Sequence, residues 1–213
     1  MTEETYGGFN VPKNVRRNPG GLLTVAEITE AVAWPGADKT KLANLLRWYV
    51  RQGYMFAFAK EAEGRKSYLF LPDQVLVADV LLRMREFGVA HGEGDPKAPS
   101  NPTFTVWQAF SVWKTDLDYP GDKPPHVSPG MMVIEEYEQG QRDWTFELWS
   151  FLNPKTGEVR FESRLAANVR KLGTDLYNRL NGDQSARAVF AIDLIDVLDR
   201  IHPRNKAKRE AMN

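Results

Sequence analysis

The apolar positions of residues 23–71 follow helical spacing twice and then strand spacing twice. The first helical stripe consists of Val25, Ile28, Ala31 and Val32. Thr24 precedes this stripe, and Glu27 completes a Thr-x-x-Glu capping box, so we expect a helix to begin here. The run Trp34-Pro35-Gly36 predicts the end of that helix, because proline disfavours a helical residue before it.

A second, longer helix is predicted after Asp38, whose side chain can cap it. The apolar face of this helix is supplied by Leu42, Leu45, Leu46 and Tyr49. Its opposite face carries lysine, asparagine and arginine side chains. Gly53 stands where a glycine commonly ends a helix, so we expect the helix to end there.

Two segments rich in aromatic strand formers follow, residues 54–60 and 66–71. They flank the polar tip 61–65, and this pattern predicts a hairpin with a loop of medium length. A third helix is predicted from Gln74 to Phe87, where Gly88 ends it.

The second half of the chain is predicted to combine helices with an antiparallel sheet. Residues 91–102 are rich in glycine, proline and polar residues, as linkers are. The predicted strands are Met131–Glu138, Trp144–Leu152 and Glu158–Arg164, the last two joined by the turn 153–157. Apolar stripes predict one helix through Val106, Phe110, Trp113 and Leu117, a second through Leu165, Val169, Leu172, Leu176 and Leu180, and a third over Ala186–Ile201. The aromatic content of the first segment would also suit a strand.

Aromatic side chains crowd into the middle of the chain. On the strand Trp144–Leu152, one face carries Trp144, Phe146 and Leu148, and the other carries Trp149 and Phe151. We therefore expect both faces of this strand to be covered. Three roles suit these residues: a hydrophobic core, a dimer or partner surface, or a pocket for a small-molecule effector.

Three runs of residues resemble the winged helix-turn-helix superfamily of bacterial regulators. They are Leu46–Tyr54 (LRWYVRQGY), Gly64–Tyr68 (GRKSY) and Leu81–Gly88 (LLRMREFG), and they are similar to the second helix, wing and following helix of the MerR family. The second helix is about one turn longer than in a typical MerR protein, and no dimerising coiled coil follows Gly88. The resemblance therefore favours the broader superfamily, and it ends near Ala90.

The predicted fold class is α+β: an N-terminal winged helix-turn-helix, then a mixed domain with a small antiparallel sheet and two C-terminal helices. The expected divisions are a flexible arm (1–20), the winged helix-turn-helix (21–90), a linker (91–102), an α+β dimerisation or sensing domain (103–202) and a basic tail (203–213).

Positive charge is concentrated in two parts of a chain whose net charge is zero. Residues 13–72 carry ten lysines and arginines against five acids, and residues 200–213 carry five against one. The acidic excess falls between them. Binding to DNA phosphates requires such a positive segment, although a chance fluctuation of this size also occurs.

The resemblance and the residue types together suggest roles for ten side chains. Lys39, Thr40, Lys41 and Asn44 stand on the first turns of the second helix, where base-reading groups lie in a recognition helix. Backbone contacts are expected of Arg47 and Arg51. Arg65 and Lys66 at the wing tip are expected to reach phosphate or the adjacent minor groove, and Arg16 and Arg17 in the arm to follow the minor groove. The alternative for each is a solvated surface charge.

The sequence predicts neither an enzyme nor a cofactor site. Cysteine is absent, which excludes disulfides and thiolate metal sites. The three histidines lack the spacing of metal ligands, and no phosphate-binding loop or nucleophile elbow is present. Asp193, Asp196 and Asp199 recur at helical spacing, but a solvated helix face explains them better than a metal site. No apolar run reaches the ~20 residues that span a bilayer, so we expect a cytoplasmic protein without membrane contact.

Two functions fit these features. The first is a sequence-specific regulator that binds double-stranded DNA as a homodimer, with the wide apolar face of the helix Ala186–Ile201 contributing to the dimer contact. The second is a winged-helix module that binds other proteins within a larger assembly. Lysines and arginines of the second helix without local acidic partners would favour DNA, whereas acids that engage them would favour the protein module.

Overall fold

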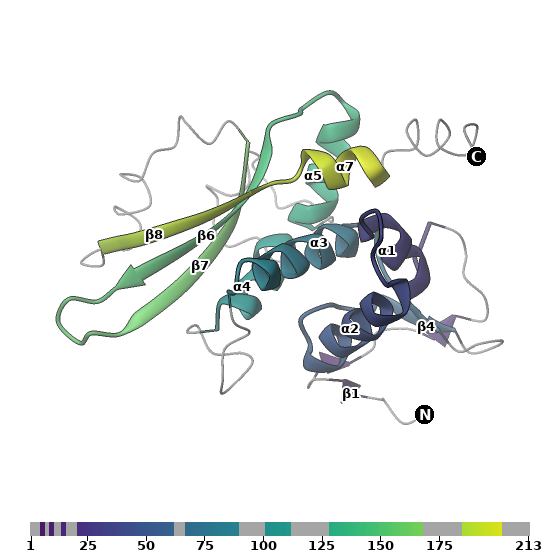
Figure 1. The fold of residues 1–213 in the computed structure, drawn as a ribbon, viewed down its shortest axis with the longest axis horizontal. Coiled ribbons are helices and arrows are strands. Elements are labelled where there is room, and N and C mark those ends of the chain that lie inside the picture. Colours follow the sequence, from purple (N-terminus) through teal and green to yellow (C-terminus); the bar gives the residue numbers. More distant parts are fainter. Residues whose placement is uncertain are drawn as a thin grey trace. The chain divides into compact units, whose positions relative to one another are not determined.

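The computed structural model describes residues 5–6, 9–10, 14–15, 21–61, 67–89, 101–111, 128–167 and 185–201. Within these residues the protein is a mixed α+β structure with small sheets (Figure 1). The chain divides into two compact units, Met1–Asp79 and Val80–Asn213. The division falls inside helix α3 (Asp73–Glu86), and the linker over residues 91–102 remains a prediction, since residues 91–100 lie outside the described ranges.

Two helices of the first unit begin where their capping residues predict. Helix α1 (Val25–Val32) follows Thr24, and the reciprocal capping box between Thr24 and Glu27 is present. Helix α2 (Lys39–Gln52) follows Asp38, whose carboxylate accepts the backbone N–H groups of Thr40 and Lys41 at 3.0 Å. The capping predictions are therefore confirmed.

Gly53 ends α2 in the left-handed conformation, with φ of 76°. The N–H of Tyr54 donates to the carbonyl of Tyr49 at 2.9 Å, which closes the helix end. We expect Gly53→Ala to lower the free energy of unfolding by about 1 kcal/mol or more, because a Cβ strains this conformation. Gly53→Asn should cost less, since asparagine tolerates positive φ. Urea denaturation checks both variants, and equal midpoints for wild type and Gly53→Ala would contradict this expectation.

The predicted hairpin is present but shorter than the sequence suggests. Strand β4 (Ala59–Glu61) pairs antiparallel with β5 (Tyr68–Leu69), and β3 (Asn14–Val15) pairs parallel with β4. Directly before β4, the N–H of Phe58 still donates to the carbonyl of Leu69 on β5 at 2.7 Å. The N–H of Phe56 instead donates to the side chain of Gln74 at 2.8 Å. The apolar residues Leu22, Ala59 and Leu69 form a small core beneath the sheet.

Three short strands lie within the predicted flexible arm. Strand β1 (Thr5–Tyr6) pairs antiparallel with β2 (Phe9–Asn10), and β3 joins the sheet of the hairpin. These strands describe six residues of the arm, and its flexibility remains a prediction.

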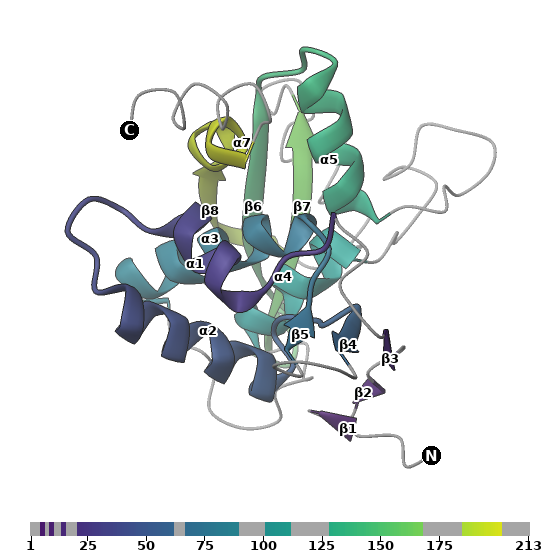
Figure 2. The ribbon, with the colours of Figure 1, turned by 90° about the vertical axis from the view of Figure 1, so that its right-hand side faces the viewer.

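The second unit contains a three-stranded antiparallel sheet with the order β7-β6-β8 (Figure 2). Its strands are β6 (Trp144–Leu152), β7 (Val159–Ala167) and β8 (Ser185–Asp193), and its helices include α4 (Pro102–Ser111), α5 (Pro129–Glu138) and α7 (Ile195–Ile201). Strand β6 coincides with its prediction. The turn after it is also confirmed, since the N–H of Gly157 donates to the carbonyl of Asn153 at 2.8 Å.

Both faces of β6 are covered, as predicted. On one face, which we call the helix-side face, Phe146 stacks on Phe110 of α4 with ring centroids 5.8 Å apart. On the opposite face Glu147, Trp149 and Phe151 are buried. The aromatic residues of β6 are thus core residues, and a partner surface or effector pocket near them remains a prediction.

The predicted strand Met131–Glu138 is wrong, because these residues form α5. The hydroxyl of Ser128 accepts the N–H of Met131 at 3.1 Å, and Pro129 occupies the first turn, so a strong helix start precedes the segment. Val133 and Tyr137, four residues apart, supply the buried face.

The predicted helix Ala186–Ile201 is also wrong over most of its length. Residues 185–193 form β8, which pairs antiparallel with β6, and only α7 at the end is helical. Asp193 marks the change, because its carboxylate accepts the N–H of Ile195 at 2.8 Å and caps α7. Of the predicted helix before it, Leu165 lies in β7 instead, and the positions beyond Ala167 lie outside the described residues, as do Trp113 and Leu117.

Helix α3 agrees with its prediction to within one residue at each end. Its residues Val75–Leu82 are buried, including Asp79. Among the described helices, none combines the length and the hydropathy required to cross a membrane.

Candidate nucleic-acid interface

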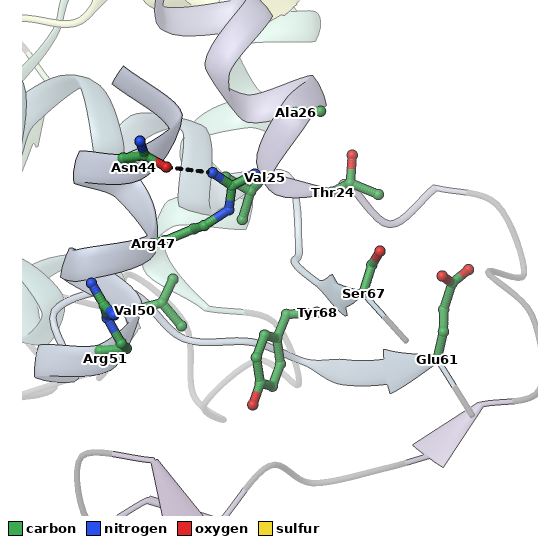
Figure 3. A pocket seen from close by; sticks show the side chains of 10 residues that line it. All are labelled: Thr24, Val25, Ala26, Asn44, Arg47, Val50, Arg51, Glu61, Ser67 and Tyr68. Atoms are coloured by element: carbon green, nitrogen blue, oxygen red, sulfur yellow. Dashed lines mark hydrogen bonds between the residues drawn. The ribbon is translucent and has the colours of Figure 1, made fainter. Parts of the chain in front are cut away.

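A pocket of about 760 Å³ lies within the first unit, between the start of α1, the second half of α2 and the hairpin β4–β5 (Figure 3). Three of the predicted DNA-binding residues line it: Asn44, Arg47 and Arg51. They stand at positions i, i+3 and i+7 of α2, a spacing that places them along one face of the helix. We call this site the α2–hairpin groove.

The two arginines of the groove differ in their side-chain contacts. One guanidinium nitrogen of Arg47 donates to the side-chain oxygen of Asn44 at 2.8 Å, which orients both side chains (Figure 3). Arg51 is exposed, and no ion pair joins it to another residue in the described ranges. Neither arginine has an acidic partner there, so both guanidinium groups can bind an external anion.

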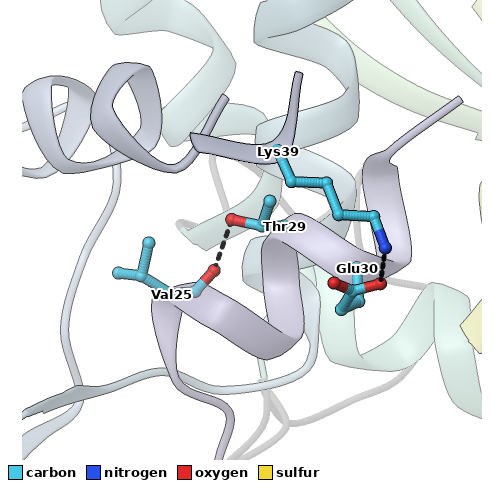
Figure 4. A network of polar contacts seen from close by, with 4 residues as sticks. All are labelled: Val25, Thr29, Glu30 and Lys39. Atoms are coloured by element: carbon cyan, nitrogen blue, oxygen red, sulfur yellow. Dashed lines mark hydrogen bonds and ion pairs between the residues drawn. The ribbon is translucent and has the colours of Figure 1, made fainter. Parts of the chain in front are cut away.

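The first turn of α2 is electrostatically different, because acids engage both of its lysines. The ammonium group of Lys39 lies 2.6 Å from the carboxylate of Glu30 on α1 (Figure 4). The ammonium group of Lys41 lies 3.6 Å from the carboxylate of Asp38. All four side chains are exposed, and exposed ion pairs contribute only about 0–1 kcal/mol, so a phosphate can displace either acid. Thr40 is exposed between the two lysines.

Asp38 carries its charge at neutral pH. Its pKa is lowered first by the backbone N–H of Lys41 and further by the charge of the Lys41 ammonium group, and these effects exceed the opposing desolvation. The carboxylate therefore caps α2 as an anion, at the end of the helix where negative charge is stabilised.

The hairpin supplies the other wall of the groove through Glu61, Ser67 and Tyr68. The ammonium group of Lys60 lies 5.4 Å from the centre of the Tyr68 ring, in a cation–π arrangement. Ser67 and Tyr68 are not among the site residues that the sequence predicts, although they directly follow the predicted wing tip. Four predicted contacts lie outside the described residues: Arg65, Lys66, Arg16 and Arg17.

The acidic residues near the C-terminus have separate structural roles. Asp193 caps α7, Asp199 accepts the hydroxyl of Tyr137, and Asp196 lies 3.8 Å from Arg83. Over the described part of the chain, no group of three or more histidine, aspartate or glutamate side chains is placed to hold a metal ion.

Comparison with models of protein families, with curated proteins and with solved structures found no match. The α2–hairpin groove and its charges are therefore the basis for a functional assignment.

Proposed function

We propose that this chain is a sequence-specific DNA-binding protein of the winged helix-turn-helix kind. In this proposal α2 enters the major groove and the hairpin β4–β5 contacts the adjacent backbone as a wing. The observation that carries the proposal is the α2–hairpin groove, where Arg47 and Arg51 line a pocket without acidic partners among the described residues.

The chemistry of the groove suits phosphate and base edges. Arginine binds phosphate oxygens through two parallel N–H donors, and an asparagine side chain can pair with adenine. The order of α1, α2 and the hairpin, with β3 added to its sheet, supports the same proposal. The excess of five positive charges over residues 13–72 also supports the proposal. Lysine and arginine side chains that neutralise phosphates release the counterions of DNA, and this release favours binding.

The alternative, a protein-interaction module, is favoured by the start of α2. There Glu30 and Asp38 engage Lys39 and Lys41, as expected for a surface whose charges are already balanced. The cations at the start of α2 are thus paired with acids, whereas, among the described residues, those further along it are not. A DNA complex therefore requires the two lysines to exchange carboxylates for phosphate or base oxygens. Because both pairs are exposed, that exchange is inexpensive in free energy.

Selection of bound duplexes from a random pool at two salt concentrations tests the proposal. We expect one preferred sequence to be enriched at both concentrations, because base contacts survive salt better than phosphate contacts. A pool without enrichment at either concentration would favour the protein-interaction alternative.

A variant of the first turns of α2 tests which residues read bases. Lys41→Ala/Asn44→Ala should reduce the preference for the selected sequence by about 1–3 kcal/mol at individual base pairs. Arg65→Ala serves as the matched control, since removal of a wing-tip phosphate contact should weaken all sequences alike. Titration against the selected and a scrambled duplex measures both effects. Full specific affinity in the double variant would show that α2 is not the reading helix.

A further inference from the structure

Strand β8 is an outer strand of its sheet, and it carries exposed side chains on both faces. Val189 is 50 % exposed, and Ala191 on the same face is also exposed. Ala188 points to the other, helix-side face and is exposed as well. Among the described residues, Val189, Ala191 and Ala188 thus leave part of each face of β8 open, while Phe190 between them is partly covered by Phe87.

The two outer strands of this sheet are protected to different degrees. Strand β7 carries a charge at every second position from Arg160 to Arg164, and charges on an outer strand discourage pairing with another chain. From Ala188 to Ile192, β8 has no charge, proline or glycine. By sequence, β8 is the edge that can accept a further strand.

The hydrogen-bond pattern fixes which backbone groups of β8 point outward. The N–H of Leu194 donates to the carbonyl of Trp144 on β6 at 3.0 Å, so Leu194 faces β6. In an antiparallel ladder the direction alternates along the strand. Ile192 and Phe190 therefore direct their backbone groups toward β6, whereas Val189 and Ala191 direct theirs to the outer edge.

We infer that β8 pairs antiparallel with β8 of a second copy of this chain, about a two-fold axis at Phe190. In this register Val189 lies opposite Ala191 of the second copy, so outward-pointing backbone groups meet. Arg187 lies opposite Asp193 of the second copy, twice by symmetry, and both side chains are exposed. A two-fold axis at Val189 or at Ala191 would also pair the outward backbone N–H and C=O groups. It would, however, leave Arg187 and Asp193 without a cross-strand partner of opposite charge.

An aromatic pair, of which Phe87 is exposed and Phe190 is partly buried, lies close to the inferred axis. Phe190 contacts Phe87, with ring centroids 5.4 Å apart, and Phe87 is 73 % exposed. Side chains at a non-hydrogen-bonded antiparallel pair approach most closely, so the two Phe190 rings meet at the axis and apolar surface is buried there. The result is a continuous six-stranded sheet that joins two copies of the chain.

A charge-swap experiment tests both the partner and the register. Arg187→Glu and Asp193→Lys should each weaken self-association about tenfold, because each places like charges opposite one another twice. A mixture of the two variants should recover wild-type affinity, since every introduced charge then faces its opposite. Sedimentation equilibrium gives the masses, and circular dichroism confirms that Asp193→Lys, which also removes the cap of α7, remains folded.

Substitutions at Val189 give an independent test. Val189→Pro removes an outward N–H that no strand of this sheet uses, so the chain should stay folded and become monomeric. Val189→Thr keeps the N–H and the β-branched shape and should stay dimeric. A wild-type chain that is monomeric throughout the micromolar range would overturn the inference, as would a dimer that Arg187→Glu and Val189→Pro leave unchanged. DNA titration of the same samples separates this result from the proposed function, because a monomer retains its groove.

Discussion

Replacing Glu147 with alanine should lower the free energy of unfolding by about 3–5 kcal/mol, because it breaks a buried ion pair by removing one partner. The Glu147 side chain is 1 % exposed, and that of Arg164 is 13 % exposed. One carboxylate oxygen of Glu147 accepts the Nε–H of Arg164 at 2.6 Å and the indole N–H of Trp149 at 2.8 Å. The substitution removes the acceptor that both donors share and leaves the largely buried positive charge of Arg164 without this carboxylate.

The matched control lies on the same face of the same sheet. Glu162 forms an ion pair with Arg160 at 2.5 Å, but these side chains are 25 % and 34 % exposed. Glu162→Ala should therefore cost about 1 kcal/mol or less. Urea denaturation, followed by tryptophan fluorescence, compares the two variants. Equal losses would show that the burial of Glu147 does not set the cost.

The second large effect is expected in the α2–hairpin groove. Arg47→Ala/Arg51→Ala should weaken binding to every duplex about a hundredfold at low salt, because two phosphate contacts are lost. The slope of log K against log salt concentration should become shallower by about 2 for the same reason. Fluorescence anisotropy with a labelled duplex measures both quantities.

A control with the same change in net charge shows whether position matters. Arg85 and Arg142 are exposed and do not line the α2–hairpin groove. The variant Arg85→Ala/Arg142→Ala should therefore leave the affinity for DNA and the slope of its salt dependence nearly unchanged. If both double variants weaken binding equally, total charge and not the groove determines the affinity.

The parts of the fold that were predicted correctly depend on local chemistry. The capping box of Thr24, the cap at Asp38 and the left-handed Gly53 each act within a few residues, so their consequences can be predicted without knowledge of the tertiary structure. Strand β6 was predicted to the residue because aromatic and β-forming side chains continue on both faces and end at a strong turn.

The secondary-structure predictions were wrong where an apolar run is compatible with both a helix and a strand. Residues 186–193 satisfy both a helical stripe and strand alternation, and their pairing with β6 about forty positions earlier in the chain decides between them. Exposed Val189 is therefore a feature of a strand edge and not of a wide helix face. Leu194, which belongs to the segment Ala186–Ile201 that the sequence places at a dimer contact, is buried in its own chain.

The candidate site could be predicted only in part for a related reason. Helical spacing places Asn44, Arg47 and Arg51 on one face, and the structure brings them to one pocket. The engagement of Lys39 by Glu30 depends on how α1 packs against α2, so the sequence could not supply it. The same holds for Tyr68, which reaches the groove only through the pairing of β5 with β4.

The salt dependence of duplex binding by the unmodified chain tests the central proposal most directly. Four cations of the groove and the wing tip, Arg47, Arg51, Arg65 and Lys66, predict a linear plot of log K against log salt concentration with a slope of about −3 to −4. Steeper slopes would indicate additional phosphate contacts. Absence of binding at low salt and micromolar protein, or a slope near zero, would contradict DNA binding through the α2–hairpin groove.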